Sequence, residues 1–198
     1  MFEQIKNKLK NLPLYTTKNG YEYFVYPYKG LTPIDMEEIS FLSKEICKQI
    51  PKNVDLIFTV ETDGILTALP VSIELKKPLI SARIFNYRIE NFYKLVQETG
   101  YSKRDLFFSF DPKRIRRVAI VDCILSTGGT IKASVELFEK LGVEVSGIFT
   151  VINKINYTDA DFLESISDKF YSIFDVEVKN GKILVNKSVY NRALDKKK

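Results

Sequence analysis

The most informative part of the chain is the segment Val118-Ala119-Ile120-Val121-Asp122-Cys123-Ile124-Leu125-Ser126-Thr127-Gly128-Gly129-Thr130. Its apolar start predicts a buried strand that ends in an acid, and its small residues predict a turn into a helix. Two glycines let the backbone approach a phosphate closely, and the N–H groups of a helix start point toward an anion. A carboxylate at a strand end instead accepts hydrogen bonds from sugar hydroxyls. The segment therefore suits a phosphorylated ribose.

Two other interpretations of this segment are available. An ordinary strand-to-helix turn capped by Thr127 fits the spacing alone equally well. A nucleoside triphosphatase loop is disfavoured because its lysine is missing, since Ile131 and Lys132 follow Thr130. Spacing alone leaves the choice between a phosphate site and a plain turn open.

Apolar and amphipathic runs alternate on both sides of the segment. Thr32-Pro33 supplies the cap residue and first-turn proline of a helix start. Strands that alternate with helices predict an α/β fold with a mainly parallel sheet flanked by helices. We expect strands at 54–60, 79–85, 118–121 and 143–151, and helices at 34–50, 64–75 and about 130–141.

Two regions depart from this alternation. Residues 86–110 form a polar, aromatic-rich stretch that is longer than an ordinary connection and is typical of a mobile lid. Lys179-Asn180-Gly181 separates two alternating runs and predicts a C-terminal β-hairpin, which we interpret as a small β appendage. We expect a single domain over 1–198, with residues 1–30 and about 170–190 contributing to a small hood and appendage.

The composition limits the chemistry. The chain has 198 residues, a formal net charge of +5 and no histidine, which excludes the usual general base and most transition-metal sites. Cys47 and Cys123 make no disulfide or zinc pattern. The positive charge fits nucleic-acid binding, but most basic residues are scattered among acidic ones, so a polyanionic small ligand explains it equally well. We expect the small ligand and no nucleic-acid partner. No apolar stretch reaches the roughly 20 residues that span a bilayer, and charges interrupt residues 1–10, so we expect a cytoplasmic protein without a membrane partner.

The segment quoted first resembles the phosphoribosyl pyrophosphate motif of type I phosphoribosyltransferases, in which apolar residues precede two acids and a Thr-Gly-Gly-Thr loop. The resemblance implies that Asp122 is the first acid, which binds the ribose hydroxyls and takes part in catalysis. Cys123 lies in the same ribose site, where the family usually has the second acid. The residues implied to bind the 5-phosphate are Ser126, Thr127, Gly128, Gly129 and Thr130.

The resemblance extends to a pyrophosphate site. Residues 60–64 follow a predicted strand and open a predicted helix, as the pyrophosphate loop of the family does. Arg83 matches a family arginine near the pyrophosphate, although Ile84 replaces the lysine that often follows it. Asp63 is a departure, because an acid beside pyrophosphate is repulsive unless it turns away or meets magnesium. The backbone N–H groups implied to face the pyrophosphate are those of Glu61, Thr62, Asp63 and Gly64.

The stretch Gln97-Glu98-Thr99-Gly100-Tyr101-Ser102-Lys103 resembles the mobile catalytic loop of archaeal purine phosphoribosyltransferases. This resemblance implies that Glu98 carries the purine proton, that Tyr101 covers the site and that Lys103 meets the pyrophosphate, with water excluded by closure. A polar surface loop is the alternative for the same residues.

Shorter matches extend the resemblance to the archaeal adenine and hypoxanthine branch along most of the chain. They are Gly20-Tyr21-Glu22-Tyr23-Phe24, Val176-Glu177-Val178 and Asn180-Gly181-Lys182. In that branch a small hood covers the purine, so Tyr23, Phe24 and Phe174 are candidates to stack on the base. Aromatic residues at strand spacing are also typical of a core, which is the alternative for these three.

The implied reaction transfers the 5-phosphoribosyl group of phosphoribosyl pyrophosphate to a purine, with Mg²⁺ as cofactor and no metal ligand expected from the protein. Ser126 favours adenine, and hence AMP as product, because typical hypoxanthine-guanine enzymes carry an aspartate at that loop position. Hypoxanthine or guanine is the alternative base. A regulator that senses phosphoribosyl pyrophosphate without turnover is an alternative of another class, motivated by Cys123, Asp63 and Ile84. The family also implies a homodimer.

Overall fold

The structure is a computed structural model that describes residues 1–18, 20–87, 92–99 and 102–192. Its centre is a six-stranded sheet in the order β10-β9-β8-β7-β3-β4. All neighbours in this sheet are parallel except β9 and β10, which are antiparallel. The sheet strands are β3 (Leu56–Val60), β4 (Leu79–Ala82), β7 (Arg117–Leu125), β8 (Glu144–Lys154), β9 (Phe170–Lys179) and β10 (Lys182–Lys187).

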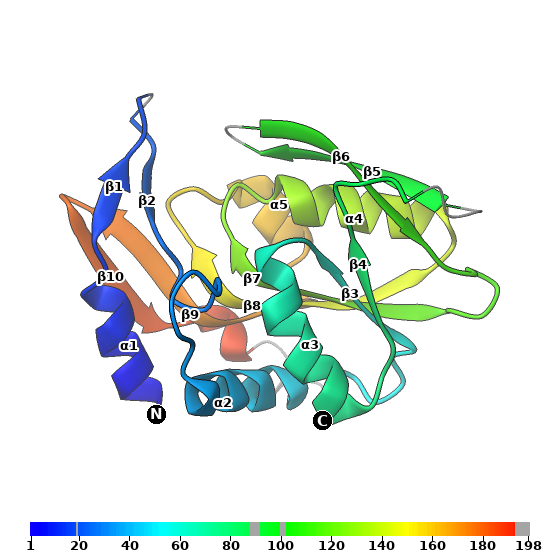
Figure 1. Ribbon diagram of the computed structural model, residues 1–198, viewed down its shortest axis with the longest axis horizontal. Coiled ribbons are helices and arrows are strands. Elements are labelled where there is room, and N and C mark those ends of the chain that lie inside the picture. Colours follow the sequence, from blue (N-terminus) through cyan, green and yellow to red (C-terminus); the bar gives the residue numbers. More distant parts are fainter. Residues whose placement is uncertain (19, 88–91, 100–101, 193–198) are drawn as a thin grey trace.

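Helices cover both faces of the sheet (Figure 1). One apolar cluster joins the sheet to the first three helices, and a second joins it to α4 and the β5–β6 hairpin on the opposite face. The mainly parallel α/β prediction is therefore confirmed. The helices are α1 (Phe2–Lys10), α2 (Met36–Cys47), α3 (Asp63–Leu75), α4 (Gly129–Lys140), α5 (Ala160–Ser165) and the short 3-10 helix η1 (Val189–Arg192).

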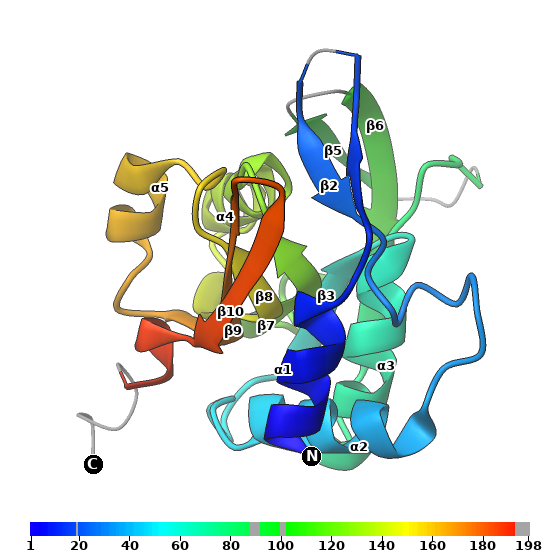
Figure 2. The same cartoon turned by 90° about the vertical axis from the view of Figure 1, so that its left-hand side faces the viewer.

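Two small antiparallel hairpins stand apart from the sheet. They are β1 (Leu14–Thr16) with β2 (Glu22–Phe24), and β5 (Phe92–Thr99) with β6 (Ser102–Ser109). Both project to the same side of the central sheet (Figure 2). The β1–β2 hairpin lies within residues 1–30, which the sequence predicts to contribute to the hood, and we call this hairpin the hood.

The predicted lid, residues 86–110, is not an irregular loop over its described part. Leu95 and Gln97 on β5, with Leu106 and Phe108 on β6, are buried, while their strand neighbours Lys94 and Asp105 are exposed and form an ion pair of 2.6 Å. This is the period-2 alternation of a strand with one covered face. The sequence prediction missed it because exposed Val96 and Phe92 obscure the pattern.

Three other predictions need correction. The hairpin about Asn180 is present, but β9 and β10 extend the central sheet, so residues 170–190 form no separate appendage. Helix α2 is capped by Asp35, whose carboxylate accepts from the N–H groups of Glu37 and Glu38, and not by Thr32. Strand β7 continues to Leu125, so Asp122 lies within the strand and not at its end.

Candidate active site

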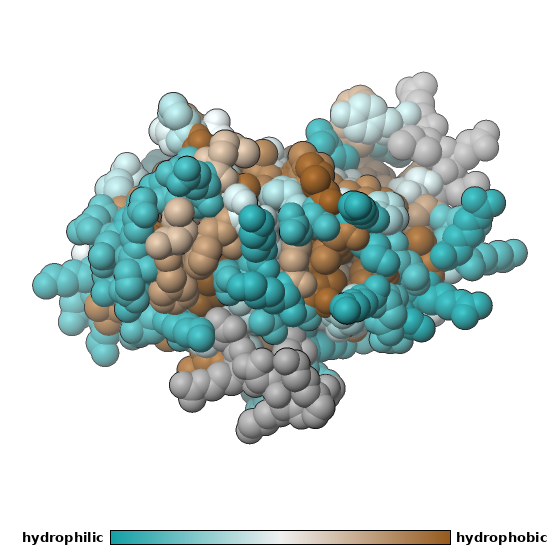
Figure 3. Space-filling model, turned by 90° about the horizontal axis from the view of Figure 1, so that it is seen from below, coloured by the Kyte–Doolittle hydropathy of each residue, from teal (hydrophilic) through white to brown (hydrophobic). Residues whose placement is uncertain are grey.

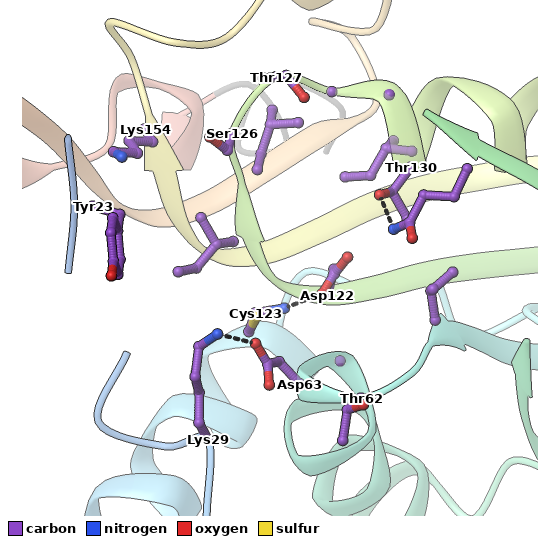
Figure 4. A pocket seen from close by; sticks show the side chains of 18 of the residues that line it. Tyr23, Lys29, Thr62, Asp63, Asp122, Cys123, Ser126, Thr127, Thr130 and Lys154 are labelled. Atoms are coloured by element: carbon purple, nitrogen blue, oxygen red, sulfur yellow. Dashed lines mark hydrogen bonds and ion pairs between the residues drawn. The ribbon is translucent and has the colours of Figure 1, made fainter. Parts of the chain in front are cut away.

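A pocket of about 500 Å³ opens at the carboxyl ends of β3, β7 and β8 (Figure 4). In α/β sheets this edge is the usual place for a ligand. Residues 61–64 and 126–130 line it from the strand-to-helix loops, and Tyr21, Tyr23 and Phe24 line it from the hood. The sequence predicted both loops, and the structure places them in one pocket.

The loop of residues 126–130 leads from β7 into α4. Gly128 has φ of +86°, a conformation that L side chains rarely adopt, and a Cβ there would lie 2.8 Å from the Phe162 ring. Glycine is therefore required at this turn. The backbone N–H groups that open α4 receive no side-chain cap, whereas Asp35 caps α2 and Asp159 caps α5. Uncapped helix N–H groups that face a pocket are suited to bind an anion.

The loop of residues 61–64 leads from β3 into α3, whose start also lacks a side-chain cap. A Cβ on Gly64 would lie 2.2 Å from Thr59 Oγ1 and 3.1 Å from Asp122 Oδ1. The helix backbone is thus packed directly against the strand that carries Asp122. The N–H of Glu61 is used by the sheet, because it donates to the Ala82 carbonyl at 3.0 Å. The prediction that this N–H faces pyrophosphate is therefore wrong.

Asp122 lines the pocket between the two loops. Its Oδ1 accepts a hydrogen bond of 2.7 Å from the N–H of Cys123. Burial, helped by the negative charge of Asp63, raises the pKa of the Asp122 carboxyl to about 6. Asp122 is therefore a carboxylate at neutral pH that becomes protonated in mildly acidic solution.

Cys123 and Asp63 are two of the positions at which the sequence departs from the family pattern, and both line the pocket. The Cys123 side chain is buried, and burial raises the pKa of its thiol well above the usual value, so it supplies no second negative charge. Asp63 forms an ion pair of 2.5 Å with Lys29, a residue of the segment between β2 and α2 (Figure 4). This partner offsets the repulsion that the sequence predicts between Asp63 and pyrophosphate.

Lys154 is the cation on the hood side of the pocket. Its Nζ donates to the Glu22 carbonyl at 2.6 Å and to the Tyr21 hydroxyl at 3.2 Å. The same ammonium lies 4.4 Å from the ring centre of Tyr21 and 4.0 Å from that of Tyr157. Burial lowers the pKa of Lys154 to about 8. The Tyr21 hydroxyl also lies 3.1 Å from Ser126 Oγ, which joins the hood to the loop of residues 126–130.

The β5–β6 hairpin forms another wall of the pocket. Gln97 Nε2 donates to Thr130 Oγ1 at 2.5 Å, and Arg104 Nε donates to Gln97 Oε1. Both Gln97 and Arg104 line the pocket. The hairpin is thus tied by side chains to the loop that opens α4.

Several predicted site residues lie elsewhere. Arg83 Nε pairs with Glu61 Oε2 at 2.5 Å, and Arg83 does not line the pocket. Lys103 is exposed on β6 and also lies outside the lining. Phe174 is fully buried and packs against Phe2, with ring centres 4.7 Å apart. The prediction that Phe174 stacks on a base is therefore wrong, because no face of its ring reaches the pocket.

The remaining predictions divide between the described and undescribed parts of the chain. Tyr23 and Phe24 line the pocket, as predicted, with Tyr23 partly exposed and Phe24 buried. The backbone of Glu98 pairs with that of Lys103 in the hairpin, whereas the Glu98 side chain is not described. Tyr101 lies outside the described residues.

Lys29, Gln97, Arg104 and Lys154 line the pocket without having been predicted to do so. A sequence indication existed for Lys154, because it ends an apolar run that follows the helix after Asp122. Successive parallel strands bring such ends to one edge of a sheet. No comparable pattern marks Lys29, since its position depends on the path of an irregular segment.

Comparisons with known proteins show the family and the fold of the chain. The model of the phosphoribosyl transferase domain family matches residues 32–180. A hypoxanthine/guanine phosphoribosyltransferase of Aciduliprofundum boonei is 34% identical over 91% of this chain and 97% of its own length. A protein with the same name from Methanosarcina acetivorans is 36% identical over 78% of this chain and 81% of its own. The crystal structure of adenine phosphoribosyltransferase from Thermoanaerobacter pseudethanolicus has the same fold, with a TM-score of 0.70, 22% identity and coverage of 88% and 99%.

Proposed function

Because the chain belongs to the phosphoribosyltransferase family, we propose that it transfers the 5-phosphoribosyl group of phosphoribosyl pyrophosphate to hypoxanthine or guanine and releases pyrophosphate. The observation that carries the choice of base is Lys154 on the hood side of the pocket. A lysine ammonium has three donors and no acceptor. It therefore complements the 6-oxo group of hypoxanthine or guanine and opposes the 6-amino group of adenine.

Adenine, which Ser126 favours in the sequence, becomes the second candidate. The Glu22 carbonyl is the feature that supports it, since this oxygen now accepts from Lys154 and would accept equally from a 6-amino group. Adenine would require Lys154 to withdraw from that carbonyl. Because the ammonium is enclosed by Tyr21 and Tyr157, such a movement would break contacts on several sides.

Different walls of the pocket would bind different parts of the two substrates. The N–H groups of residues 126–130 would bind the 5-phosphate, and the Asp122 carboxylate would accept from the ribose hydroxyls. The start of α3, at Thr62 to Gly64, would hold the leaving pyrophosphate. Because the transition state is cation-like at the sugar carbon, catalysis rests on positioning these groups and stabilising the departing anion. Tyr23 and Phe24 would contact the base, and Glu98 stays a proposed carrier of the purine proton.

The donor set of the pocket fits a magnesium ion that is shared with the substrate. Within the described residues, no three acidic or cysteine side chains gather to hold a metal ion by themselves. Magnesium commonly uses one or two carboxylates together with substrate phosphates and water. Asp122, with Asp63 beside it, would supply those carboxylates. When bound, the ion neutralises charge on the pyrophosphate.

A homodimer and a cytoplasmic location stay predictions. The face seen from below, over α1 to α3, carries apolar side chains among polar ones (Figure 3). Met36 on α2 and Leu69 and Ile73 on α3 are large apolar residues exposed to solvent. Light scattering of the purified protein measures the number of chains directly.

No helix in the described part of the chain is long and apolar enough to cross a membrane.

The test mixes the protein, magnesium and phosphoribosyl pyrophosphate with hypoxanthine, guanine or adenine in separate reactions, and follows nucleotide formation by chromatography. We expect IMP or GMP to form much faster than AMP. AMP alone would establish the second candidate. Binding of phosphoribosyl pyrophosphate without product from any base would favour the regulator.

Lys154→Gln tests the residue on which the choice of base depends. Because hydrogen bonds to charged groups contribute about 1.5–3 kcal/mol, we expect kcat/KM for hypoxanthine to fall roughly 10- to 100-fold. The value for adenine should stay constant or rise, since glutamine offers an acceptor. Lys140→Gln, on the exposed last turn of α4, is the matched control. Equal losses with both bases would contradict the proposed contact.

A further inference from the structure

The cations that line the pocket differ in their partners. Lys29 pairs with the carboxylate of Asp63, and Lys154 donates to a carbonyl and a hydroxyl of the hood. Within the described part of the chain, the guanidinium of Arg104 has one partner, the neutral amide of Gln97. No described carboxylate pairs with it. Because charged groups in partly enclosed sites are normally paired, this guanidinium is arranged to meet an anion that enters the pocket.

The direction of Arg104 follows from the strand that carries it. Residues 104, 106 and 108 of β6 share one face, and Leu106 and Phe108 on that face are buried against the molecule. Lys103 and Asp105 lie on the other face and are exposed. Arg104 is therefore held inward by the same alternation that buries its apolar neighbours.

A chain of side chains then connects Arg104 to the loop of residues 126–130. Arg104 Nε donates to the Gln97 oxygen, and the Gln97 nitrogen donates to Thr130 Oγ1 at 2.5 Å, which is the dashed line at Thr130 in Figure 4. The amide fixes one edge of the guanidinium and leaves its other N–H donors for a ligand. A guanidinium fork matches two oxygens of a phosphate.

We propose that Arg104 binds the 5-phosphate of phosphoribosyl pyrophosphate from the hairpin side, opposite the N–H groups of residues 126–130. The inference rests on the proposed function and adds a residue to it. The sequence predictions assign the 5-phosphate to residues 126–130 alone. The two cations that they name, Arg83 and Lys103, are assigned to the pyrophosphate, and neither lines the pocket. The bound 5-phosphate would then contact both the β5–β6 hairpin and the start of α4, and its binding would stabilise the position of the hairpin over the pocket.

The test measures binding of ribose 5-phosphate, phosphoribosyl pyrophosphate and magnesium pyrophosphate by calorimetry. For Arg104→Gln we expect the affinity for both ribose phosphates to fall at least about tenfold, as loss of a charge-assisted contact implies, with pyrophosphate within about twofold of wild type. Lys94→Gln is the matched control, because it removes a cation from the outer face of the same hairpin and outside the pocket. It should bind all three ligands as wild type does.

Two results would overturn the inference. One is unchanged ribose 5-phosphate affinity in Arg104→Gln, and the other is a loss confined to pyrophosphate, which would place the guanidinium at the leaving group. If Arg104→Gln fails to fold, Arg104→Lys decides, since it keeps the charge without the fork and should give an intermediate loss. If the wild type forms nucleotide and Arg104→Gln binds ribose 5-phosphate as the wild type does, this inference is rejected and the proposed function stands. Wild-type protein that binds no phosphoribosyl pyrophosphate rejects the proposed function as well.

Discussion

The pocket has two sides that are built differently. The loop side consists of residues 61–64 and 126–130, and each of these loops is one continuous strand-to-helix turn. The hood side consists of Tyr21, Tyr23, Phe24 and Lys154, which come from the β1–β2 hairpin and from the distant end of β8. The loop side is rigid because helix starts pack directly on strands. The hood side is held by side-chain contacts, chiefly around the Lys154 ammonium.

The two sides should differ most in their tolerance of a single added methyl group. Gly64→Ala would place a Cβ 2.2 Å from Thr59 Oγ1 and 3.1 Å from Asp122 Oδ1, so these side chains must shift or α3 must move away from β3. Overpacking of this kind typically costs about 1–3 kcal/mol of unfolding free energy. Displacement of the α3 start should also lower phosphoribosyl transfer roughly 100-fold, because catalysis depends on position within about 1 Å. Thermal unfolding and initial rates measure the two effects.

Gly20→Ala is the counterpart on the hood side. Gly20 has φ of +82° but no atom within 4 Å of its would-be Cβ, so only backbone strain of about 1–2 kcal/mol is expected, with little change in rate. The double variant Thr59→Ala/Gly64→Ala removes the clashing oxygen and should recover part of the lost activity. Equal tolerance of alanine at Gly64 and Gly20 would break the distinction between the two sides.

The second prediction separates the two sides by pH. Asp122 is charged above its pKa of about 6, so affinity for phosphoribosyl pyrophosphate should fall as the pH falls through about 6. Lys154 is charged below its pKa of about 8, so affinity for the purine base should fall as the pH rises through about 8. Each loss should approach about tenfold per pH unit beyond the pKa, as a single titration requires.

Variants identify the titrating groups. In Asp122→Asn, the affinity for phosphoribosyl pyrophosphate should no longer fall below about pH 6, apart from any change caused by titration of the substrate. Lys154→Arg should abolish the dependence on the alkaline side, because an arginine keeps its proton throughout this range. Steady-state KM values for both substrates between pH 5 and 9.5, roughly the span of the two titrations, supply the measurement. A rise of the KM for phosphoribosyl pyrophosphate above about pH 8 would contradict the assignment of Lys154 to the base.

The same division explains what the sequence could predict. Asp122 and the turn through Gly128 are fixed by local physics, since a buried strand, a positive φ and a helix start follow one another along the chain. The parallel sheet followed from the alternation of apolar and amphipathic runs. Lys154 reaches the pocket through the pairing of β8 with β7. Arg104 reaches it because the β5–β6 hairpin contacts Thr130 through Gln97, a contact that the local sequence does not reveal. Arg83 was misplaced because the sequence does not reveal that Glu61 is its partner.

The smallest predicted effect concerns the ion pair of Lys29 and Asp63, which links the segment between β2 and α2 to the loop side. Both side chains are about one-third exposed, at 32% and 31%, so water screens their attraction. We expect a double-mutant cycle of Lys29→Gln and Asp63→Asn to give a coupling below about 1 kcal/mol in unfolding free energy. Substrate binding should respond in the opposite sense for the two single variants. Lys29→Gln leaves Asp63 unpaired beside the pyrophosphate and weakens binding, whereas Asp63→Asn removes the repulsion. A coupling well above 1 kcal/mol, with no difference in pyrophosphate affinity, would mean that the pair instead serves to hold the segment between β2 and α2 on the loop side.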